Sequence, residues 1–115
     1  ALSQAQILRI VEGKVNPGSQ EELLELQLAF WRPPLSAHRD MLGGWVGIRE
    51  LPPYHYLAVT LWRNEGAHDR WVEEHVPRLR EKTQARRAFA EIHAYKIFLA
   101  SEWKCLGGER EAACS

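Results

Sequence analysis

The most constraining feature of this sequence is the segment from Tyr54 to Trp62, which reads Tyr-His-Tyr-Leu-Ala-Val-Thr-Leu-Trp. It is rich in aromatic and β-branched residues and follows the turn signal Pro52-Pro53, so it predicts a strand. Successive side chains of a strand point to opposite faces, and both faces of this strand carry apolar groups. We therefore expect both faces of its sheet to be covered.

The first strand and the first helix have their own signals. Residues 7–15 are rich in β-branched and other apolar side chains, which predicts a strand. Ser19 followed by Glu22 fits a capping box at a helix start, and apolar residues then recur at three- and four-residue spacing. Pro33 and Pro34 are expected to end this helix, because proline lacks the amide donor and clashes with the preceding turn.

The second helix is predicted to begin after Asn64, a good N-cap residue, with Glu65 as a favourable first-turn acid. Pro77 is expected to interrupt this helix and to open a further helical segment that reaches Ala90. The two remaining strands are expected over residues 45–51 and 92–100.

The resulting order of elements is β-α-β-β-α-β. It predicts the ferredoxin-like α+β fold, an antiparallel sheet with its helices on one face. Both helices are used on that face, so the chain has no element left to cover the other. We therefore expect a second copy of the chain to cover it, which makes the protein a homodimer.

Length and charge limit the class of protein. The 115 residues, 13.3 kDa, suit one domain, expected over 1–103, with 104–115 as a flexible C-terminal tail. Fifteen Lys and Arg residues balance fifteen Asp and Glu residues, which argues against a nucleic-acid partner. No apolar run approaches the roughly 20 residues of a membrane span. Without a signal segment at its start, the chain is expected to be cytoplasmic, with no membrane partner.

Two cysteines, Cys105 and Cys114, lie in the expected tail. Free thiols are expected in a reducing cytoplasm, and a disulfide within the tail is the alternative. Two sulfur ligands without a nearby histidine do not complete a four-coordinate zinc site, so we assign them no metal.

The third strand and second helix carry a motif that resembles the antibiotic biosynthesis monooxygenase family. Family members have a Tyr-x-x-x-Thr-Leu-Trp segment, a capping residue and an acid, and then Ala-Phe-x-x-Trp. The matching positions here are Tyr56, Thr60, Leu61, Trp62, Asn64, Glu65, Ala67, His68 and Trp71. The resemblance implies a dimeric α+β barrel. It also implies a monooxygenase that acts on a small hydroxylated aromatic compound, of quinol or anthrone type, with no metal or other cofactor.

Two departures from the family pattern bear on function. His68 stands where the family has phenylalanine, which places an ionisable ring where a ring facing the sheet is expected. Heme-degrading members carry an asparagine on the first strand and a histidine nine residues after the helix tryptophan. This chain has Val11 and Arg80 at those positions, so the resemblance implies that hemin is not degraded.

A cofactor-free oxygenase requires a base, because a phenolate gives up an electron to oxygen more readily than a phenol does. His68 and His75 are seven residues apart with Trp71 between them, on one helical face if the helix stays regular. Burial favours the neutral imidazole that accepts a proton, and such a base is worth about 10² to 10⁴ in rate. His68 is the first candidate and His75 the second, and the alternative is that each histidine only packs.

The candidate substrate-binding residues are aromatic. In the functional interpretation they form the walls of a pocket, and in the alternative they fill the core, which favours a non-catalytic, dimeric, small-molecule-binding protein of the same fold. They are Trp31, Tyr56, Trp62 and Trp71. Tyr95 is a further hydroxyl that could orient a substrate oxygen or only pack.

Two further clusters have open interpretations. His55 and His93 meet in a metal site only if their strands are neighbours. The segment 78–87 holds five basic residues and one acid, which steers an anionic ligand or is simply a solvated helix face. The basic residues are Arg78, Arg80, Lys82, Arg86 and Arg87.

Overall fold

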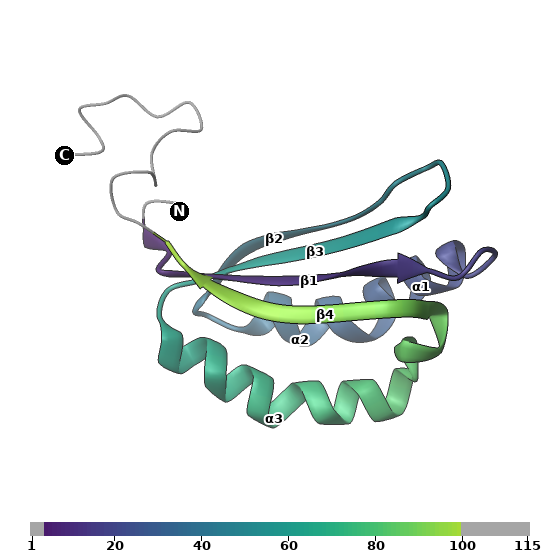
Figure 1. Cartoon of the computed structure of the whole chain (residues 1–115). Helices are drawn as coiled ribbons and strands as arrows, with labels where there is room; N and C mark the ends of the chain where they lie inside the picture. Colours follow the sequence, from purple (N-terminus) through teal and green to yellow (C-terminus); the bar gives the residue numbers. More distant parts are fainter. Residues whose placement is uncertain (1–3, 100–115) are drawn as a thin grey trace.

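The structure is a computed structural model that describes residues 4–99. Its centre is a four-stranded antiparallel sheet in the order β2-β3-β1-β4 (Figure 1). The strands are β1 (Ile7–Val15), β2 (Met41–Ile48), β3 (His55–Trp62) and β4 (Phe89–Phe98). The expected tail, with both cysteines, lies outside the described residues.

All helices lie on one face of this sheet (Figure 1). They are α1 (Gln20–Leu26), the π-helical turn η2 (Gln27–Trp31), α2 (Arg32–Ala37), α3 (Glu65–Thr83) and the 3₁₀ turn η3 (Ala85–Ala88). The order of elements and the one-sided helical layer confirm the predicted ferredoxin-like α+β fold. In the described part of the chain, no helix combines the length and apolar character needed to cross a membrane.

The predicted end of the first helix at Pro33 and Pro34 is wrong. The chain passes through η2 and continues into α2, whose first turn holds both prolines. Proline fits there because amides of a first helical turn need no carbonyl partner, and the wide π turn relieves the ring clash.

The capping box expected at Ser19 and Glu22 does not form. The Ser19 backbone is already in the right-handed helical region (φ −99°, ψ 0°), and its side chain makes no capping hydrogen bond. A capping serine needs extended backbone to aim its hydroxyl at the first turn. The first helix still begins here, because the Leu23 amide donates to the Ser19 carbonyl at 3.0 Å.

Helix α3 is continuous, so the interruption predicted at Pro77 is also wrong. Pro77 has no amide hydrogen, so the carbonyl of Glu73 loses its helical hydrogen-bond partner. Both residues lie on the exposed side of the helix, where water can bond that carbonyl. The predicted N-cap is confirmed, because the Ala67 amide donates to Asn64 Oδ1 at 2.8 Å. The helix ends at Gln84, which has a left-handed φ of 51°.

Two strand starts differ from the prediction by three residues or more. β2 begins at Met41 rather than at residue 45, and a register irregularity lies between Met41 and Gly43. β4 begins at Phe89 rather than at residue 92, because η3 returns the chain directly to the sheet. Both β2 and β4 start in a run of apolar and small residues, so the sequence does not mark where strand pairing begins.

The core lies between the sheet and the helices, in two clusters. One contains Ile7, Trp62, Ala67, Trp71 and Val76, and the other contains Val15, Leu23, Tyr56 and Ala88. In both β1 and β3, the alternate side chains that face the helices are the ones that build these clusters.

The opposite face of the sheet carries apolar side chains that no helix covers. Trp45, Leu57, Tyr95 and Ile97 are 63%, 41%, 42% and 40% exposed. The strand registers place them on one face, with Ile10 and Val59 between them. We call this surface the open face. It has the character expected of a surface that a second layer covers.

One end of the open face is polar. His55 lies 3.9 Å from Glu12, and His93 lies 2.8 Å from Glu91. The two histidines stand on β3 and β4, which β1 separates, so the condition for a two-histidine metal site, that their strands are neighbours, is not met. The described residues contain no group of three or more His, Cys, Asp or Glu side chains able to hold a metal.

Candidate functional site

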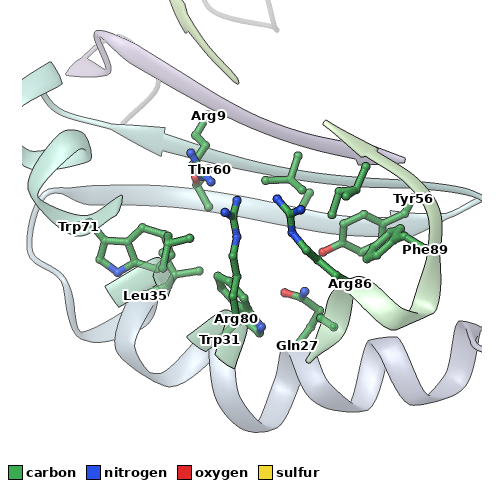
Figure 2. Close-up of a pocket in the computed structure, with 15 residues that line it drawn as sticks. Arg9, Gln27, Trp31, Leu35, Tyr56, Thr60, Trp71, Arg80, Arg86 and Phe89 are labelled. Carbon is green, nitrogen blue, oxygen red and sulfur yellow. The ribbon is translucent and has the colours of Figure 1, made fainter. Parts of the chain in front are cut away.

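A cavity of about 80 Å³ lies between the sheet and the helical layer (Figure 2). Every strand except β2 contributes to its wall, as do η2, α2, α3 and η3. Its larger apolar residues are Val11, Trp31, Leu35, Trp71, Val76, Phe89 and Ile92. Its polar residues are Arg9, Gln27, Tyr56, Thr60, Arg80 and Arg86.

Aromatic rings shape the two ends of this cavity. At one end Trp31 and Trp71 are tilted by 50° with their ring centres 6.3 Å apart. At the other, Tyr56 meets Phe89 edge to face at 5.2 Å. Burial raises the pKa of the Tyr56 hydroxyl, which therefore stays protonated at neutral pH and is able to donate a hydrogen bond. The shape suits a flat apolar compound.

Three arginines from three different elements line the same cavity. Arg9 projects from β1 and is 9% exposed, Arg80 comes from α3, and Arg86 comes from η3. Burial and the charge of Arg80 lower the pKa of Arg9, and burial and the charge of Arg86 lower that of Arg80. Arg9 and Arg80 still remain cations at neutral pH, because a guanidinium pKa is lowered from a starting value far above 7.

Arg80 and Arg86 belong to the basic segment predicted from the sequence, whereas Arg9 was not predicted as a site residue. A signal was present, since Arg9 stands between Ile7 and Val11 in the alternating pattern of β1, and both neighbours in that pattern are apolar. A charged residue at such a position is predicted to face the core.

Of the predicted substrate-binding residues, Trp31, Tyr56 and Trp71 line the cavity. Trp62 does not, because it is fully buried in the adjacent core cluster. The two positions that distinguish heme-degrading members, Val11 and Arg80, both line the cavity. Tyr95 instead lies on the open face, on the other side of the sheet.

The two candidate bases lie outside the cavity lining. Because α3 stays regular through Pro77, His68 and His75 do share one helical face with Trp71. His75 stacks on Trp71 with ring centres 6.0 Å apart, and His68 meets Trp62 edge to face at 5.8 Å.

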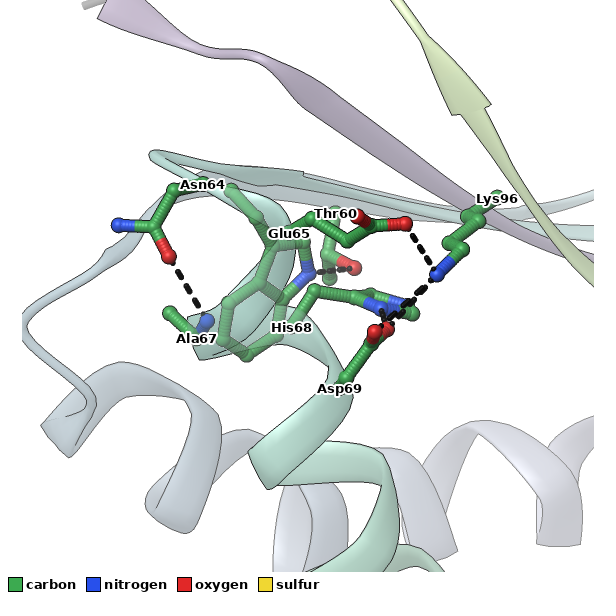
Figure 3. A network of polar contacts seen from close by, with 8 residues as sticks. Thr60, Asn64, Glu65, Ala67, His68, Asp69 and Lys96 are labelled. Atoms are coloured by element: carbon green, nitrogen blue, oxygen red, sulfur yellow. Dashed lines mark hydrogen bonds and ion pairs between the residues drawn. The ribbon is translucent and has the colours of Figure 1, made fainter.

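His68 is 4% exposed and belongs to a polar network (Figure 3). Its Nδ1 lies 2.8 Å from Asp69 Oδ1, and Lys96 Nζ bonds both Asp69, at 3.0 Å, and Glu65, at 2.7 Å. The Nε2 atom of His68 is buried and has no partner among residues 4–99. Burial lowers the pKa of His68 more than the Asp69 hydrogen bond raises it, so the neutral ring is favoured at pH 7.

Acidification from about pH 7.5 to about pH 5.5 is expected to lower the free energy of unfolding, with His68 as one cause. The unfolded chain takes up a proton on this ring below its ordinary pKa of about 6.5, while the folded ring, whose pKa is lower, stays neutral. Proton uptake by the unfolded state alone favours unfolding. Urea titrations at both pH values measure the loss. It should be smaller in His68→Phe, and an equal loss in the two proteins would contradict the assignment.

No family model matches the sequence, and no curated protein matches it. The comparison with solved structures does find matches. A monooxygenase from the gene ActVA-Orf6 of Streptomyces coelicolor, in complex with Nanaomycin D, has 15% identity and a TM-score of 0.68 over 84% of this chain and 89% of that one.

Two further solved structures have the same architecture. A dimeric ferredoxin-like protein from an uncultured marine organism has 14% identity and a TM-score of 0.69, over 90% of this chain and 95% of that one. A protein assigned as an antibiotic biosynthesis monooxygenase, from Bordetella bronchiseptica, has 20% identity and a TM-score of 0.64, over 84% of this chain and 99% of that one. The chain therefore has the ferredoxin-like α+β fold that antibiotic biosynthesis monooxygenases also adopt, as its sequence motif predicted.

Proposed function

We propose that this protein is a monooxygenase that binds a small hydroxylated aromatic compound in the arginine-lined cavity and oxidises it with O₂. The observation that carries the proposal is the cavity itself, an apolar space with aromatic ends on the helix side of the sheet. The monooxygenase of the same fold whose structure contains Nanaomycin D supports this class of ligand.

The electron balance of such a reaction needs no external reductant. An anthrone-type methylene loses four electrons as it becomes a carbonyl group. One atom of O₂ becomes the carbonyl oxygen, and the other leaves as water with the two hydrogens of the methylene. The protein has to bind the compound, exclude water and favour removal of the first proton.

We keep His68 as the candidate for the base. Asp69 holds its Nδ1, its Nε2 is buried without a partner, and its lowered pKa favours the form that accepts a proton. Because His68 lies outside the cavity lining, this role requires the cavity wall to shift when a ligand binds. Ligand binding without turnover is the second candidate, since no described residue of the lining is a histidine, aspartate or glutamate.

An oxygen electrode with a panel of hydroquinones and anthrones, with no added metal or flavin, tests the proposal. With an active compound, His68→Phe is expected to lower the rate by about 10² or more, because a positioned base contributes at least that much. The fold should persist, since phenylalanine is the residue that the family motif has at this position.

His75→Phe is the matched variant on the same helix face. A large loss in that variant and a small one in His68→Phe would move the role to His75. Equal rates in both variants and the parent would reject both bases. Consumption of no compound, despite measurable binding, would favour the binding protein over the oxygenase.

We also propose that the protein is a homodimer that buries the open face. The apolar side chains there are too numerous for a surface that meets only water, and the helical layer of one chain covers the other face. The neighbour described as a dimeric ferredoxin-like protein supports this assembly.

A further inference from the structure

We propose that the cavity ligand is bound as an anion, an aromatic compound with a carboxylate or phenolate oxygen held by Arg9, Arg80 and Arg86. This inference rests on the proposed function in one respect, that the cavity is the ligand site. It adds the charge of the ligand and the residues that select it.

The cavity leaves positive charge uncompensated, above all at Arg9, which is 9% exposed, whereas Arg80 and Arg86 line the cavity from exposed positions. A buried guanidinium is strongly unfavourable unless an anion pairs with it. Within residues 4–99, no carboxylate forms an ion pair with any of the three arginines. The charged groups that lower the pKa of Arg9 and Arg80 are themselves arginines, and this repulsion adds to the energetic cost of the unpaired charge.

Three other cations of residues 4–99 have acidic partners, namely Lys14, Arg63 and Lys96, and the remaining Lys and Arg side chains there have none. Lys96 bonds Glu65 and Asp69, and Arg63 lies 3.3 Å from Asp40. Two of these three acids come from α3, the helix that also carries Arg80. Among the unpaired Lys and Arg side chains of residues 4–99, Arg9 alone is buried, so its charge in the cavity remains for a ligand.

The arrangement of the three arginines also favours an anionic ligand. In Figure 2 the side chains of Arg80 and Arg86 extend toward the sheet, on which Arg9 lies. The three residues are separated by as many as 77 positions in the chain and come from a strand, a helix and a 3₁₀ turn, yet they border one space. Guanidinium groups grouped in this way suit an oxyanion, which accepts several hydrogen bonds at once.

The rest of the cavity wall is apolar, which favours an aromatic ligand. Trp31, Leu35 and Phe89 offer no partner to a small hydrated ion such as phosphate, and they suit an aromatic ring. A cationic compound would be repelled by the arginines, and a neutral ring would leave them unpaired. A ring that carries one anionic oxygen satisfies both parts of the wall.

The alternative interpretation of the basic segment, a solvated helix face, fits its other members. All five basic residues of the segment are exposed, but only Arg80 and Arg86 line the cavity, and Arg78, Lys82 and Arg87 do not. Arg87 follows Arg86 directly, so it provides a matched control for a change of charge at the same end of the protein.

Isothermal titration calorimetry with two compounds of nearly equal shape tests the inference. The probes are 2-naphthoate, a carboxylate, and 2-naphthamide, its neutral isostere. The parent is expected to bind 2-naphthoate at least about tenfold more tightly, the usual effect of a charge-assisted hydrogen bond. Arg9→Met and Arg86→Met should each remove most of this preference while changing the affinity for 2-naphthamide by less than about threefold, and Arg87→Met should leave both affinities unchanged.

A third probe, 2-naphthol, separates the two sources of the anionic oxygen. Binding that strengthens with pH in the parent, and not in Arg9→Met, assigns a phenolate, whereas selective binding of 2-naphthoate assigns a carboxylate. Equal affinities for 2-naphthoate and 2-naphthamide, or equal losses in Arg86→Met and Arg87→Met, would overturn the inference and leave the proposed function standing. Failure of every probe to bind would overturn both.

Discussion

Replacement of Leu57 by aspartate is expected to convert the protein from a dimer, with twice the 13.3 kDa mass of one chain, into a monomer. Leu57 is 41% exposed on the open face and is paired across the sheet with Glu12. In a dimer that buries this face, the new carboxylate loses its water and lies beside an existing acid. We expect the dissociation constant to rise by about 100-fold or more.

Light scattering at micromolar concentrations measures this change. Leu28→Asp is the matched control, because Leu28 is 59% exposed but lies on η2, in the helical layer. It should leave the mass at the dimer value. A dimeric Leu57→Asp would place the interface elsewhere, and a parent that already has the mass of one chain would refute the dimer.

Replacement of Trp62 by alanine is expected to lower the free energy of unfolding by about 3 to 5 kcal/mol, the usual cost of truncating a buried large aromatic residue. Trp62 is fully buried, and its ring centre lies 5.6 Å from that of Trp71 and 5.1 Å from that of His38. Its indole Nε1 donates to Thr60 Oγ1 at 2.9 Å, and the substitution also removes this bond.

Urea unfolding followed by circular dichroism measures the loss, in the Leu57→Asp background so that dissociation does not contribute. Trp45→Ala, measured in the same background, is the control. Trp45 is 63% exposed on the open face, so its loss should stay below about 1 kcal/mol. Comparable losses in the two variants would mean that Trp62 does not anchor the core as its contacts indicate.

The strands that alternate most regularly were predictable to within a residue. The predicted strand at residues 7–15 has the bounds of β1, and β3 begins one residue later than predicted, at His55. Period-two alternation of apolar side chains is a local property, so it is readable without the fold. The same holds for the Asn64 cap, which depends on residues within one helical turn.

The helix boundaries at proline were not predictable in the same way. Proline breaks a helix only where the lost amide bond and the ring clash are not accommodated. At Pro33 and Pro34 the π turn accommodates them, and at Pro77 the freed carbonyl faces solvent. Both outcomes depend on which side of the helix the sheet occupies, and a local pattern does not contain that information.

The candidate site also has features that a local pattern predicts and features that it does not. The element order, the apolar character of both faces of β3 and the choice of Trp31, Tyr56 and Trp71 as cavity residues could all be predicted from the sequence. Those properties follow from side-chain type and spacing along one chain.

Two features of the site depend on the folded arrangement: Arg9, Arg80 and Arg86 border one cavity, and His68 pairs with Asp69 outside the lining of that cavity. The register of the strands and the path of α3 across the sheet bring these groups together or keep them apart. Burial then raises the energetic cost of the Arg9 charge, because a guanidinium that is inexpensive in water becomes costly in a space with little solvent and beside another arginine. That cost arises from packing between elements distant in the chain, so no local sequence pattern records it.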